Sequence, residues 1–419
     1  MMPRGRVLTL FLFSIPLLGQ PLTLEDCVRL AQSAQSAASV ARQETEIAGL
    51  GLRQARAAFL PQARIQTGYT YNSPGKGGDP QRFIALNGVH EYIGLASAGL
   101  ELDTSGRLRA GLARARADQD IAAASLALTQ RDLRRFVTQS YFRLLLTRRL
   151  AVVARESLAE ARNFEARVKL LVEGGEAAGA DLVRASAESA FFELTRNAAE
   201  LEAQVANHEL SSFWTVNVND PLTLVELLDQ PAPAPDSENP GTAYLRRFEF
   251  SLLDAEKHGF QADFRRVRAE LFPQPSLVYQ YGLDTSQVKT SNLGSAAFLN
   301  LNLPVFDWYR IRSAARQFQL RSEQSGARRQ IAERTFSREY QSALARVKSL
   351  YLQIAVTSSQ VQLSEQNLKL SRIRYEGGEG SALEVVTAQS QLGQARGNYY
   401  TTIANYRIAR MDLEVAAGR

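Results

Sequence analysis

Hydrophobic residues recur every seven positions in the second half of the chain, where the register runs through Tyr340, Val347, Ile354, Val361, Leu368 and Tyr375. A heptad repeat sustained over this length predicts a long helix in a coiled coil. Residues 107–172 form a similar stretch without proline, which at about 1.5 Å per residue would be on the order of 100 Å long. Steps of three and four continue over residues 181–213 and 385–413, so the pattern predicts two antiparallel helical hairpins.

Four short segments alternate between polar and apolar residues, as strands with two different faces do. They cover residues 64–71, 92–102, 277–283 and 298–303. Strands of about ten residues can cross a bilayer at a tilt. The aromatic residues of these segments, and one tryptophan beyond the last of them, are either core residues or a belt at the membrane interface. The alternation favours a belt, formed by Tyr69, Tyr71, Tyr279, Tyr281 and Trp308.

The order of predicted elements occurs twice: a helix, two strands, then a long helical hairpin. The first helix, residues 24–59, and its counterpart, residues 242–271, each end close to a proline, which lacks a backbone donor and disfavours helix in the preceding residue. We assign residues 21–216 to the first repeat and residues 242–419 to the second. Residues 217–241 hold five prolines and are typical of an extended connector.

A turn rich in glycine and glutamate separates the two helices of each hairpin. Its Glu-Gly-Gly-Glu sequence returns 203 positions later, and Asp181 matches Glu384 at the same spacing. We expect the turn glycines, Gly380 among them, to permit left-handed backbone. The two turns comprise Glu173, Gly174, Gly175, Glu176, Glu376, Gly377, Gly378 and Glu379.

The spacing between the halves changes away from these turns. Leu158 matches Leu368 at a spacing of 210 positions, which is seven more than at the turns. One extra heptad keeps the coiled-coil seam in phase. We therefore expect the first hairpin to be one heptad longer than the second.

The acidic residues near the turns have a functional and a structural interpretation. Gathered into rings in an oligomer, Asp181 and Glu384 would attract cations at a narrow mouth, which makes them candidate gate and selectivity residues. Ser381 and Glu384 also have the spacing of a capping box, which by itself would explain Glu384. Ala178 stands in place of the serine before Asp181, so this explanation is weaker there. The four turn glutamates are either solvated loop charges or a docking surface for an adaptor protein.

The chain has 419 residues, a net charge of +6 and a pI near 9.4. Its basic residues are scattered through helices at mixed-sign spacing, which argues against nucleic-acid binding. Arg4 and Arg6 precede an apolar run over residues 7–18, and Gly19 follows. This run is shorter than the roughly twenty residues of a membrane-spanning helix. We therefore expect residues 1–20 to be a secretory signal peptide.

Catalytic and metal-binding chemistry lack candidate residues. The single cysteine, Cys27, is expected to be buried on the first helix. His90, His208 and His258 are far apart in the sequence, so we expect no metal site. No nucleophile motif of the Gly-x-Ser-x-Gly type occurs. We expect neither enzymatic activity nor a cofactor.

Four strands cannot close into a barrel that holds a channel, and lipid does not tolerate an open sheet edge. A membrane barrel must then be shared between chains. Three copies would supply a twelve-stranded barrel and a cylinder of twelve helices. The sequence thus predicts a mainly α-helical protein with membrane strands, in which coiled-coil hairpins form a helical tunnel and four strands per chain contribute to a trimeric twelve-stranded β-barrel.

Several motifs, in this order, resemble those of the TolC-like outer membrane efflux proteins. They are Phe59-Leu60-Pro61, residues 100–107 (LELDTSGR), Leu271-Phe272-Pro273, residues 303–307 (LPVFD) and Tyr375-Glu376-Gly377-Gly378. The resemblance implies a homotrimer in the outer membrane of a Gram-negative bacterium, extending into the periplasm. It also implies a passive conduit for small toxic compounds or exported molecules in a tripartite efflux or type I secretion system. Its partners would be a periplasmic adaptor protein, an inner-membrane transporter and outer-membrane lipid.

Two positions depart from the family pattern. Well-known members pair an acid in the first tip with a base in the second, where this chain has Gly380, so that latch cannot form. Many members also have a second carboxylate three residues after the position of Glu384, where this chain has Thr387. We expect other bases to hold the tips, from the set Lys169, Arg184, Arg372 and Arg374.

The competing hypothesis is a periplasmic coiled-coil adaptor or scaffold protein without a pore. Such a protein would not need four amphipathic strands that carry aromatic residues. The strands therefore favour the channel.

Overall fold

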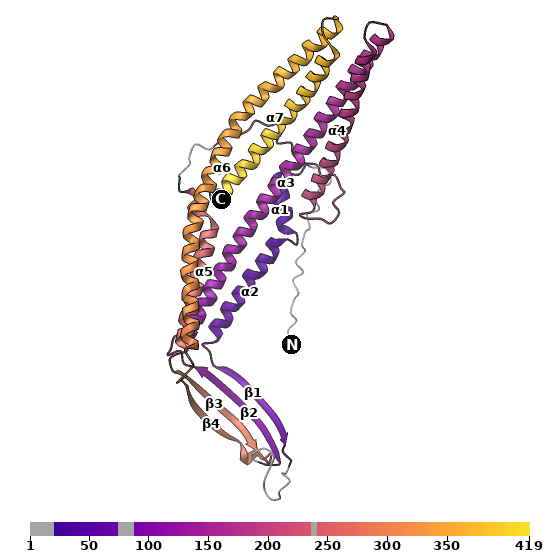
Figure 1. Ribbon diagram of the computed structural model, residues 1–419. Helices are drawn as coiled ribbons and strands as arrows, with labels where there is room; N and C mark the ends of the chain where they lie inside the picture. Colours follow the sequence, from indigo (N-terminus) through magenta and orange to yellow (C-terminus); the bar gives the residue numbers. More distant parts are fainter. Residues whose placement is uncertain (1–20, 74–87, 236–240) are drawn as a thin grey trace, which may run out of the picture. The chain divides into compact units, whose positions relative to one another are not determined.

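The computed structural model describes residues 21–73, 88–235 and 241–419. In chain order the elements are α1 (Leu24–Ser33), α2 (Ala37–Ala57), β1 (Gln62–Tyr71), β2 (His90–Glu101), α3 (Arg107–Glu173), α4 (Gly179–Ser211), η1 (Ala243–Arg246), α5 (Phe248–Ala269), β3 (Gln274–Thr285), η2 (Thr290–Asn292), β4 (Gly294–Asn302), α6 (Arg310–Glu376) and α7 (Ala382–Ala416) (Figure 1). A helix, two strands and two helices follow one another twice, from α2 to α4 and from α5 to α7. The predicted signal peptide, residues 1–20, lies outside the described residues.

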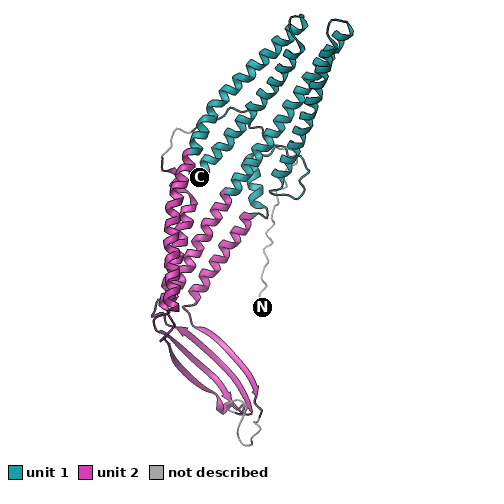
Figure 2. Ribbon diagram, viewed as in Figure 1, with its two compact units in different colours: residues 1–36, 132–239, 342–414 teal, residues 37–131, 240–341, 415–419 magenta. Residues whose placement is uncertain are grey.

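The chain divides into two compact units (Figure 2). Unit 1 consists of residues 1–36, 132–239 and 342–414, and unit 2 consists of residues 37–131, 240–341 and 415–419. Unit 1 contains the tips of both helical hairpins, and unit 2 contains the sheet. Each unit takes segments from both halves of the sequence, and the division into two sequential repeats stays a prediction.

Unit 2 contains a four-stranded antiparallel sheet in the order β1-β2-β3-β4 (Figure 1). Cross-strand partners lie on the same face of a sheet. Tyr69 pairs with Tyr92 of β2, and Tyr279 and Tyr281 pair with two alanines of β2, so the three strands share one aromatic face. The other face carries polar side chains, which include Arg64, Gln66, Gln280 and Asn300. The predicted strands and their two unlike faces are confirmed.

The two long helices, α3 and α6, each have 67 residues. Each begins after an aspartate that accepts a backbone hydrogen bond: Asp103 from Leu108 N–H at 2.9 Å, and Asp307 from Ile311 N–H at 2.9 Å. The expectation that the first hairpin is one heptad longer is therefore wrong for these helices. A shift of seven residues leaves the coiled-coil seam in phase, so periodicity alone cannot distinguish the two alignments.

Two of the predicted helices are interrupted. The helix expected over residues 24–59 breaks after α1, where Ser33 Oγ donates to a carbonyl of the preceding turn at 2.9 Å and Ala34 is extended. Serine side chains compete with the helix for backbone groups, which favours termination. The helix expected over residues 242–271 starts as a short 3-10 turn, and Arg247, in extended conformation, separates this turn from α5.

An ion cluster at the start of α5 ties three helices of unit 2 together. The guanidinium of Arg247 donates to Glu249 and Glu339 at 2.6 Å each and lies 3.7 Å from the ring centre of Phe336. Arg131 of α3 donates to Glu249 at 3.0 Å. These contacts link the start of α5 to α3 and α6. Loss of any one partner would leave a poorly solvated charge, which makes the link costly to break.

Part of the proline-rich connector packs against the start of the chain in unit 1. Leu22 and Leu224 form a parallel β-bridge, and the Tyr141 hydroxyl donates to Val225 O at 2.9 Å. Cys27 is fully buried on α1, as predicted. Burial raises the pKa of the Cys27 thiol to about 12, so the reactive thiolate is scarce at neutral pH.

Candidate gate at the helical tips

The first tip ends α3 with a compact hydrogen-bonded turn. Glu176 N–H donates to Leu171 O at 2.8 Å, and Gly175 N–H donates to Val172 O at 3.1 Å. These two bonds define a Schellman motif, which requires a left-handed residue. Gly175 supplies it with φ at +77°.

The second tip repeats this turn. Glu379 N–H donates to Arg374 O at 2.9 Å, and Gly378 N–H donates to Tyr375 O at 3.1 Å. Gly378 is left-handed with φ at +75°. Of the five turn glycines expected to permit this conformation, Gly175 and Gly378 adopt it. The matching bonds show that the two tips are built on the same backbone plan and differ in their side chains.

Asp181 lies in the first turn of α4, where the helix dipole favours an acid. Its side chain, 25% exposed, has an oxygen 3.8 Å from Arg184 Nη1. The N-cap residue, Ala178, makes no side-chain capping bond. Asp181 is thus only loosely paired and keeps its charge available at the tip.

Glu384 is held more tightly at the second tip. Its carboxylate accepts from Arg374 Nη1 at 3.0 Å, and Arg374 Nη2 also donates to Glu379 O at 3.2 Å. The hydroxyl of Ser381 accepts from Glu384 N–H at 3.4 Å, so the serine half of the expected capping box is present. The carboxylate of Glu384 instead pairs with Arg374. Arg374 therefore supplies a base at this tip, where Gly380 lacks one.

The four turn glutamates lie on the exposed surface of the tips. Glu173, Glu176 and Glu379 are exposed. Glu376 has an oxygen 3.9 Å from Arg167 Nε, with both side chains more than half exposed. At such exposure an ion pair contributes little to stability. These side chains are available to a partner, and none of them is required to hold the turn.

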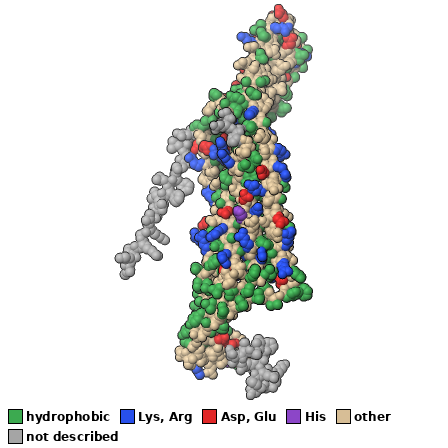
Figure 3. All heavy atoms as spheres, turned by 90° about the vertical axis from the view of Figure 1, so that its left-hand side faces the viewer, with side chains coloured by type: hydrophobic (Ala, Val, Ile, Leu, Met, Phe, Trp, Pro, Cys, Tyr) green, Lys and Arg blue, Asp and Glu red, His purple; other side chains and the backbone are tan. Residues whose placement is uncertain are grey.

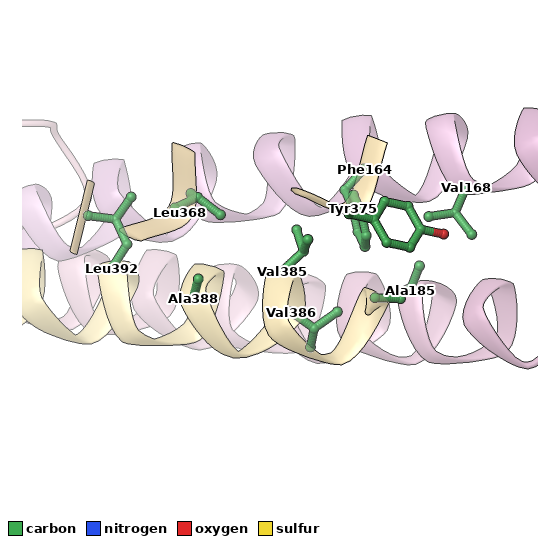
Figure 4. Packing of buried hydrophobic residues seen from close by; sticks show 10 residues of the cluster. Phe164, Val168, Ala185, Leu368, Tyr375, Val385, Val386, Ala388 and Leu392 are labelled. Carbon is green, nitrogen blue, oxygen red and sulfur yellow. The ribbon is translucent and has the colours of Figure 1, made fainter. Parts of the chain in front are cut away.

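A hydrophobic cluster packs the two hairpins together beneath the tips (Figure 4). Its buried members are Phe164, Val168, Ala185, Leu368, Tyr375, Ala382, Val385, Val386, Ala388 and Leu392. The rings of Phe164 and Tyr375 meet edge to face, with centres 5.3 Å apart. In the described residues the buried Tyr375 hydroxyl has no hydrogen-bond partner. Burial, and secondarily the charge of Asp181, raises the pKa of this hydroxyl.

Polar contacts continue the junction between the hairpins below the cluster. Glu160 of α3 has oxygens 3.9 Å from Arg372 and 3.6 Å from Arg396, which lie on α6 and α7. Gln389 Nε2 donates to the carbonyl of Glu160 at 3.2 Å. The junction thus combines an apolar core with ion pairs and a hydrogen bond between the hairpins.

Three of the four bases predicted to hold the tips lie near an acidic side chain. Arg374 binds Glu384, Arg184 lies near Asp181, and Arg372 lies near Glu160. For Lys169 no ion pair is found within the described residues. No sequence pattern predicted a role for Glu160, Arg396 or Phe164. The heptad register did include Tyr375, which was a usable signal for the cluster.

The strand aromatics gather in unit 2, in a different part of the chain from the tips. Tyr69, Tyr71, Tyr279 and Tyr281 lie on one face of the sheet and are 50% to 59% exposed. Trp308 is 83% exposed and lies in the segment between β4 and α6. The predicted interface residues therefore have the exposure that contact with lipid requires, and their role stays a prediction.

Across residues 21–73, 88–235 and 241–419, no three His, Cys, Asp or Glu side chains gather as metal ligands would. In that same part of the chain, no helix has the length and apolar character needed to cross a membrane.

The fold is that of solved outer membrane channels. The structure of CusC superimposes with a TM-score of 0.84 at 19% identity, covering 94% of this chain and 92% of that one. The open state of the MtrE outer membrane channel of Neisseria gonorrhoeae gives a TM-score of 0.79 at 19% identity, covering 94% and 88% of the two chains. Long helical hairpins combined with an amphipathic antiparallel sheet define this class of protein.

Sequence comparison identifies the family within this class. The profile described as outer membrane efflux protein matches residues 29–214 and 240–419. The chain belongs to this family, and it is an outer membrane channel component of an efflux system. The expected fold, location and function are confirmed, and the pore-free adaptor hypothesis is set aside.

Two relatives illustrate the range of the family. The toluene efflux pump outer membrane protein TtgF of Pseudomonas putida is 25% identical over 373 residues, covering 87% of this chain and 76% of TtgF. The cobalt-zinc-cadmium resistance protein CzcC of Cupriavidus metallidurans is 24% identical over 410 residues, covering 95% of this chain and 90% of CzcC. The similarity to both extends over most of each protein.

Proposed function

We propose that three copies of this chain form one conduit, with a shared twelve-stranded barrel and a gate at the helical tips. The observation that carries the proposal is the sheet, in which β1 and β4 each pair on one side only among the described residues. An unpaired edge is not tolerated in lipid. The edge of β4 in one copy therefore pairs with the edge of β1 in the next, which closes the barrel without further strands.

Exposed apolar stripes on two helices of unit 1 support association between copies. On α4 the stripe consists of side chains that are 43% to 68% exposed: Phe191, Leu194, Leu201 and Val205. On α6 it consists of side chains that are 60% to 70% exposed: Leu352, Val356, Leu363 and Leu370. Both follow helical spacing, as the face of a coiled coil does. Burial of these stripes against neighbouring copies would remove them from water.

In this arrangement the tips form the narrow periplasmic mouth. Asp181 and Glu384 from each copy would form rings of negative charge and would favour cations over anions. Asp181 contributes more, since its ion pair is looser than that of Glu384. Opening requires the two hairpins to separate or slide at the cluster around Tyr375.

The exposed turn glutamates fit a docking role. Glu173, Glu176, Glu376 and Glu379 lie at the ends of the hairpins, and the turns are held by backbone bonds that leave their side chains available. A periplasmic adaptor with basic residues at its own tip would find complementary charge there. The adaptor would link the conduit to an inner-membrane transporter, which supplies the energy.

The names of the relatives indicate the class of transported molecule only broadly. TtgF is named for toluene and CzcC for cobalt, zinc and cadmium, so relatives of similar identity are named for different molecules. A passive conduit does not need a pocket shaped for one substrate. We infer that this chain conducts small toxic compounds or other exported molecules and that the transporter selects among them.

Disulfide cross-linking between strand edges tests the shared barrel. In a Cys27→Ser background, Thr67→Cys in β1 and Ala297→Cys in β4 would pair across copies and give dimers and trimers on a denaturing gel. The matched control joins inner strands through the cross-strand partners Ser97→Cys in β2 and Gln280→Cys in β3, and it should give monomers only. Because the register between copies is open, neighbouring positions in β4 are tested as well. Monomers for every β1-β4 pair, with oxidised thiols, would overturn the proposal.

A further inference from the structure

The strand pairing brings the ends of four helices to one end of the strands in unit 2. At this end β1 and β2 pair through Gln62 and Gly99, and β3 and β4 pair through Gln274 and Asn302. The helices α2 and α5 end just before β1 and β3 begin, and α3 and α6 begin just after β2 and β4 end. Thr104 Oγ1 also donates to the carbonyl that precedes β3 at 3.2 Å, which ties two of the junctions together.

Arginines are concentrated on these four helix ends. Nine lie within five residues of the end of a helix, or about 7 Å along its axis. Three of them are paired locally: Arg107 with Glu101, Arg109 with Asp103 and Arg266 with Asp263. The other six are exposed and form no ion pair within the described residues. We call this set the arginine band: Arg53, Arg56, Arg265, Arg268, Arg310 and Arg312.

An exposed aromatic turn lies directly beside the band. Phe306, Trp308 and Tyr309 are 68%, 83% and 65% exposed, and the rings of Phe306 and Trp308 lie 4.8 Å apart. On the face shown in Figure 3, hydrophobic side chains gather where the helices meet the sheet, and basic side chains lie on the helices next to them. Arg312 approaches the ring of Tyr309, with 5.7 Å between the guanidinium carbon and the ring centre.

The backbone of this turn is strained. Trp308 and Tyr309 have φ values of +53° and +62°, a left-handed conformation that bulky residues rarely adopt. In the corresponding turn before α3 the left-handed residue is Gly106, with φ at +79°. Strain of this kind is held in place by the surrounding structure and is concentrated at functional sites. Here its effect is to present two large aromatic rings on the surface next to Arg310.

We propose that the arginine band binds the phosphate groups of anionic phospholipids in the periplasmic leaflet of the outer membrane. Aromatic rings at the membrane surface, followed by basic side chains just outside it, match the layering of a lipid interface. Guanidinium groups bind phosphate through paired hydrogen bonds. The sheet provides the apolar face on the membrane side, and among the described residues no acidic side chain forms an ion pair with the band. The inference rests on the outer-membrane location and is independent of the gate and the cargo.

Quenching of Trp308 fluorescence by brominated lipids measures the preference for anionic phospholipids next to the arginine band. The protein carries two tryptophans, so Trp214→Phe leaves Trp308 as the single reporter. The full chain is reconstituted into vesicles that contain brominated phosphatidylglycerol or brominated phosphatidylcholine. We expect an association constant around Trp308 about fivefold higher for phosphatidylglycerol at low salt, falling as salt screens the charges.

Two sets of four substitutions localise the effect. Arg53→Gln, Arg265→Gln, Arg268→Gln and Arg310→Gln, combined, should reduce the ratio to about one. The matched control removes the same charge from exposed positions of α6 farther from the sheet, through Arg321→Gln, Arg328→Gln, Arg334→Gln and Arg338→Gln. This control should keep the ratio of the parent protein.

Further arms distinguish the possible sources of phosphate. Inorganic phosphate at matched ionic strength should not displace the lipid preference, because a leaflet presents many headgroups at once. Displacement by free phosphate would overturn the assignment to lipid. No preference in the parent protein, or the same preference after the band is neutralised, would overturn the proposal. Channel conductance in the same vesicles shows separately whether the conduit has formed.

Discussion

Arg374 Nη1 lies 3.0 Å from Glu384 Oε2, and this pair closes the second tip across its own turn. The corresponding position of the first tip, by the matching backbone bonds, is Leu171, so Asp181 has no such partner across its turn. The two tips share a backbone plan and differ in how their acid is neutralised. One acid is fixed by an arginine of the preceding helix, and the other remains nearly free.

Arg374→Gln should loosen the second tip without disturbing the fold. The arginine and glutamate side chains are 55% and 42% exposed, so the pair is worth about 0.2–1 kcal/mol. If the pair favours the closed state, its loss should raise the open fraction of the reconstituted channel up to roughly fivefold. Single-channel recording in planar bilayers measures the open fraction.

Arg162→Gln is the matched control for Arg374→Gln. Arg162 and Glu193 form an ion pair at 3.2 Å, with side chains 55% and 48% exposed, inside the first hairpin and away from the tip. This substitution should leave the open fraction unchanged. Equal effects of the two substitutions would mean that Arg374 acts through its charge alone and not through its contact with Glu384.

Asp181→Asn should lower cation selectivity more than Glu384→Gln does. The charge of Glu384 is largely compensated by Arg374 at 3.0 Å, whereas Asp181 lies 3.8 Å from Arg184. The reversal potential across a tenfold KCl gradient reports the selectivity of the channel. In the Arg374→Gln background the effect of Glu384→Gln should grow to match that of Asp181→Asn. Negligible shifts in all of these proteins would remove the selectivity role from both acids.

Tyr375→Ala should weaken the junction between the hairpins. The ring is 8% exposed and packs on Phe164, and the loss of a buried aromatic side chain costs about 3–5 kcal/mol of unfolding free energy. Tyr375→Phe is the control, because it keeps the ring and removes a buried hydroxyl that has no partner in the described residues. It should be neutral or stabilising by up to about 1 kcal/mol. Chemical unfolding in detergent measures both, and equal losses would contradict the packing argument.

The same hydroxyl predicts a response to alkaline pH. Burial raises the pKa of Tyr375 above its ordinary value near 10. Stability from keeping this group neutral is fully present below the unfolded pKa and is lost as pH rises through the higher folded pKa. The melting temperature of the native protein should therefore fall relative to that of Tyr375→Phe as pH rises above about 10. A constant difference between pH 8 and 11 would show that folding does not raise the pKa of this hydroxyl.

The sequence predicted the fold well where its patterns have only one structural solution. Alternating strands placed Tyr69, Tyr279 and Tyr281 on one face, and the glycine turns placed the tips. The hydrophobic pattern failed where several alignments of the helices share the same period. A shift of one heptad is invisible to periodicity, so the expected difference in length between the long helices was wrong. The break at Ala34 depends on a local serine hydrogen bond.

The position of the candidate gate could be predicted from the sequence, whereas most of its side-chain contacts could not. Asp181 and Glu384 follow from their positions after each turn, and the capping spacing of Ser381 showed up as one of the two expected bonds. The partner of the Glu384 carboxylate depends on the path of the Arg374 side chain across the turn. Contacts between segments more than 200 residues apart, such as that of Gln389 with Glu160, require the packed structure.

Native mass spectrometry measures how many chains build one conduit, and three are expected. Protein extracted from outer membranes in mild detergent should give one dominant particle of three chains that separates into single chains on heating. The prediction follows from a sheet whose two outer strands need partners from other copies. A particle that contains a single chain, at every protein concentration and in several detergents, would contradict the shared barrel.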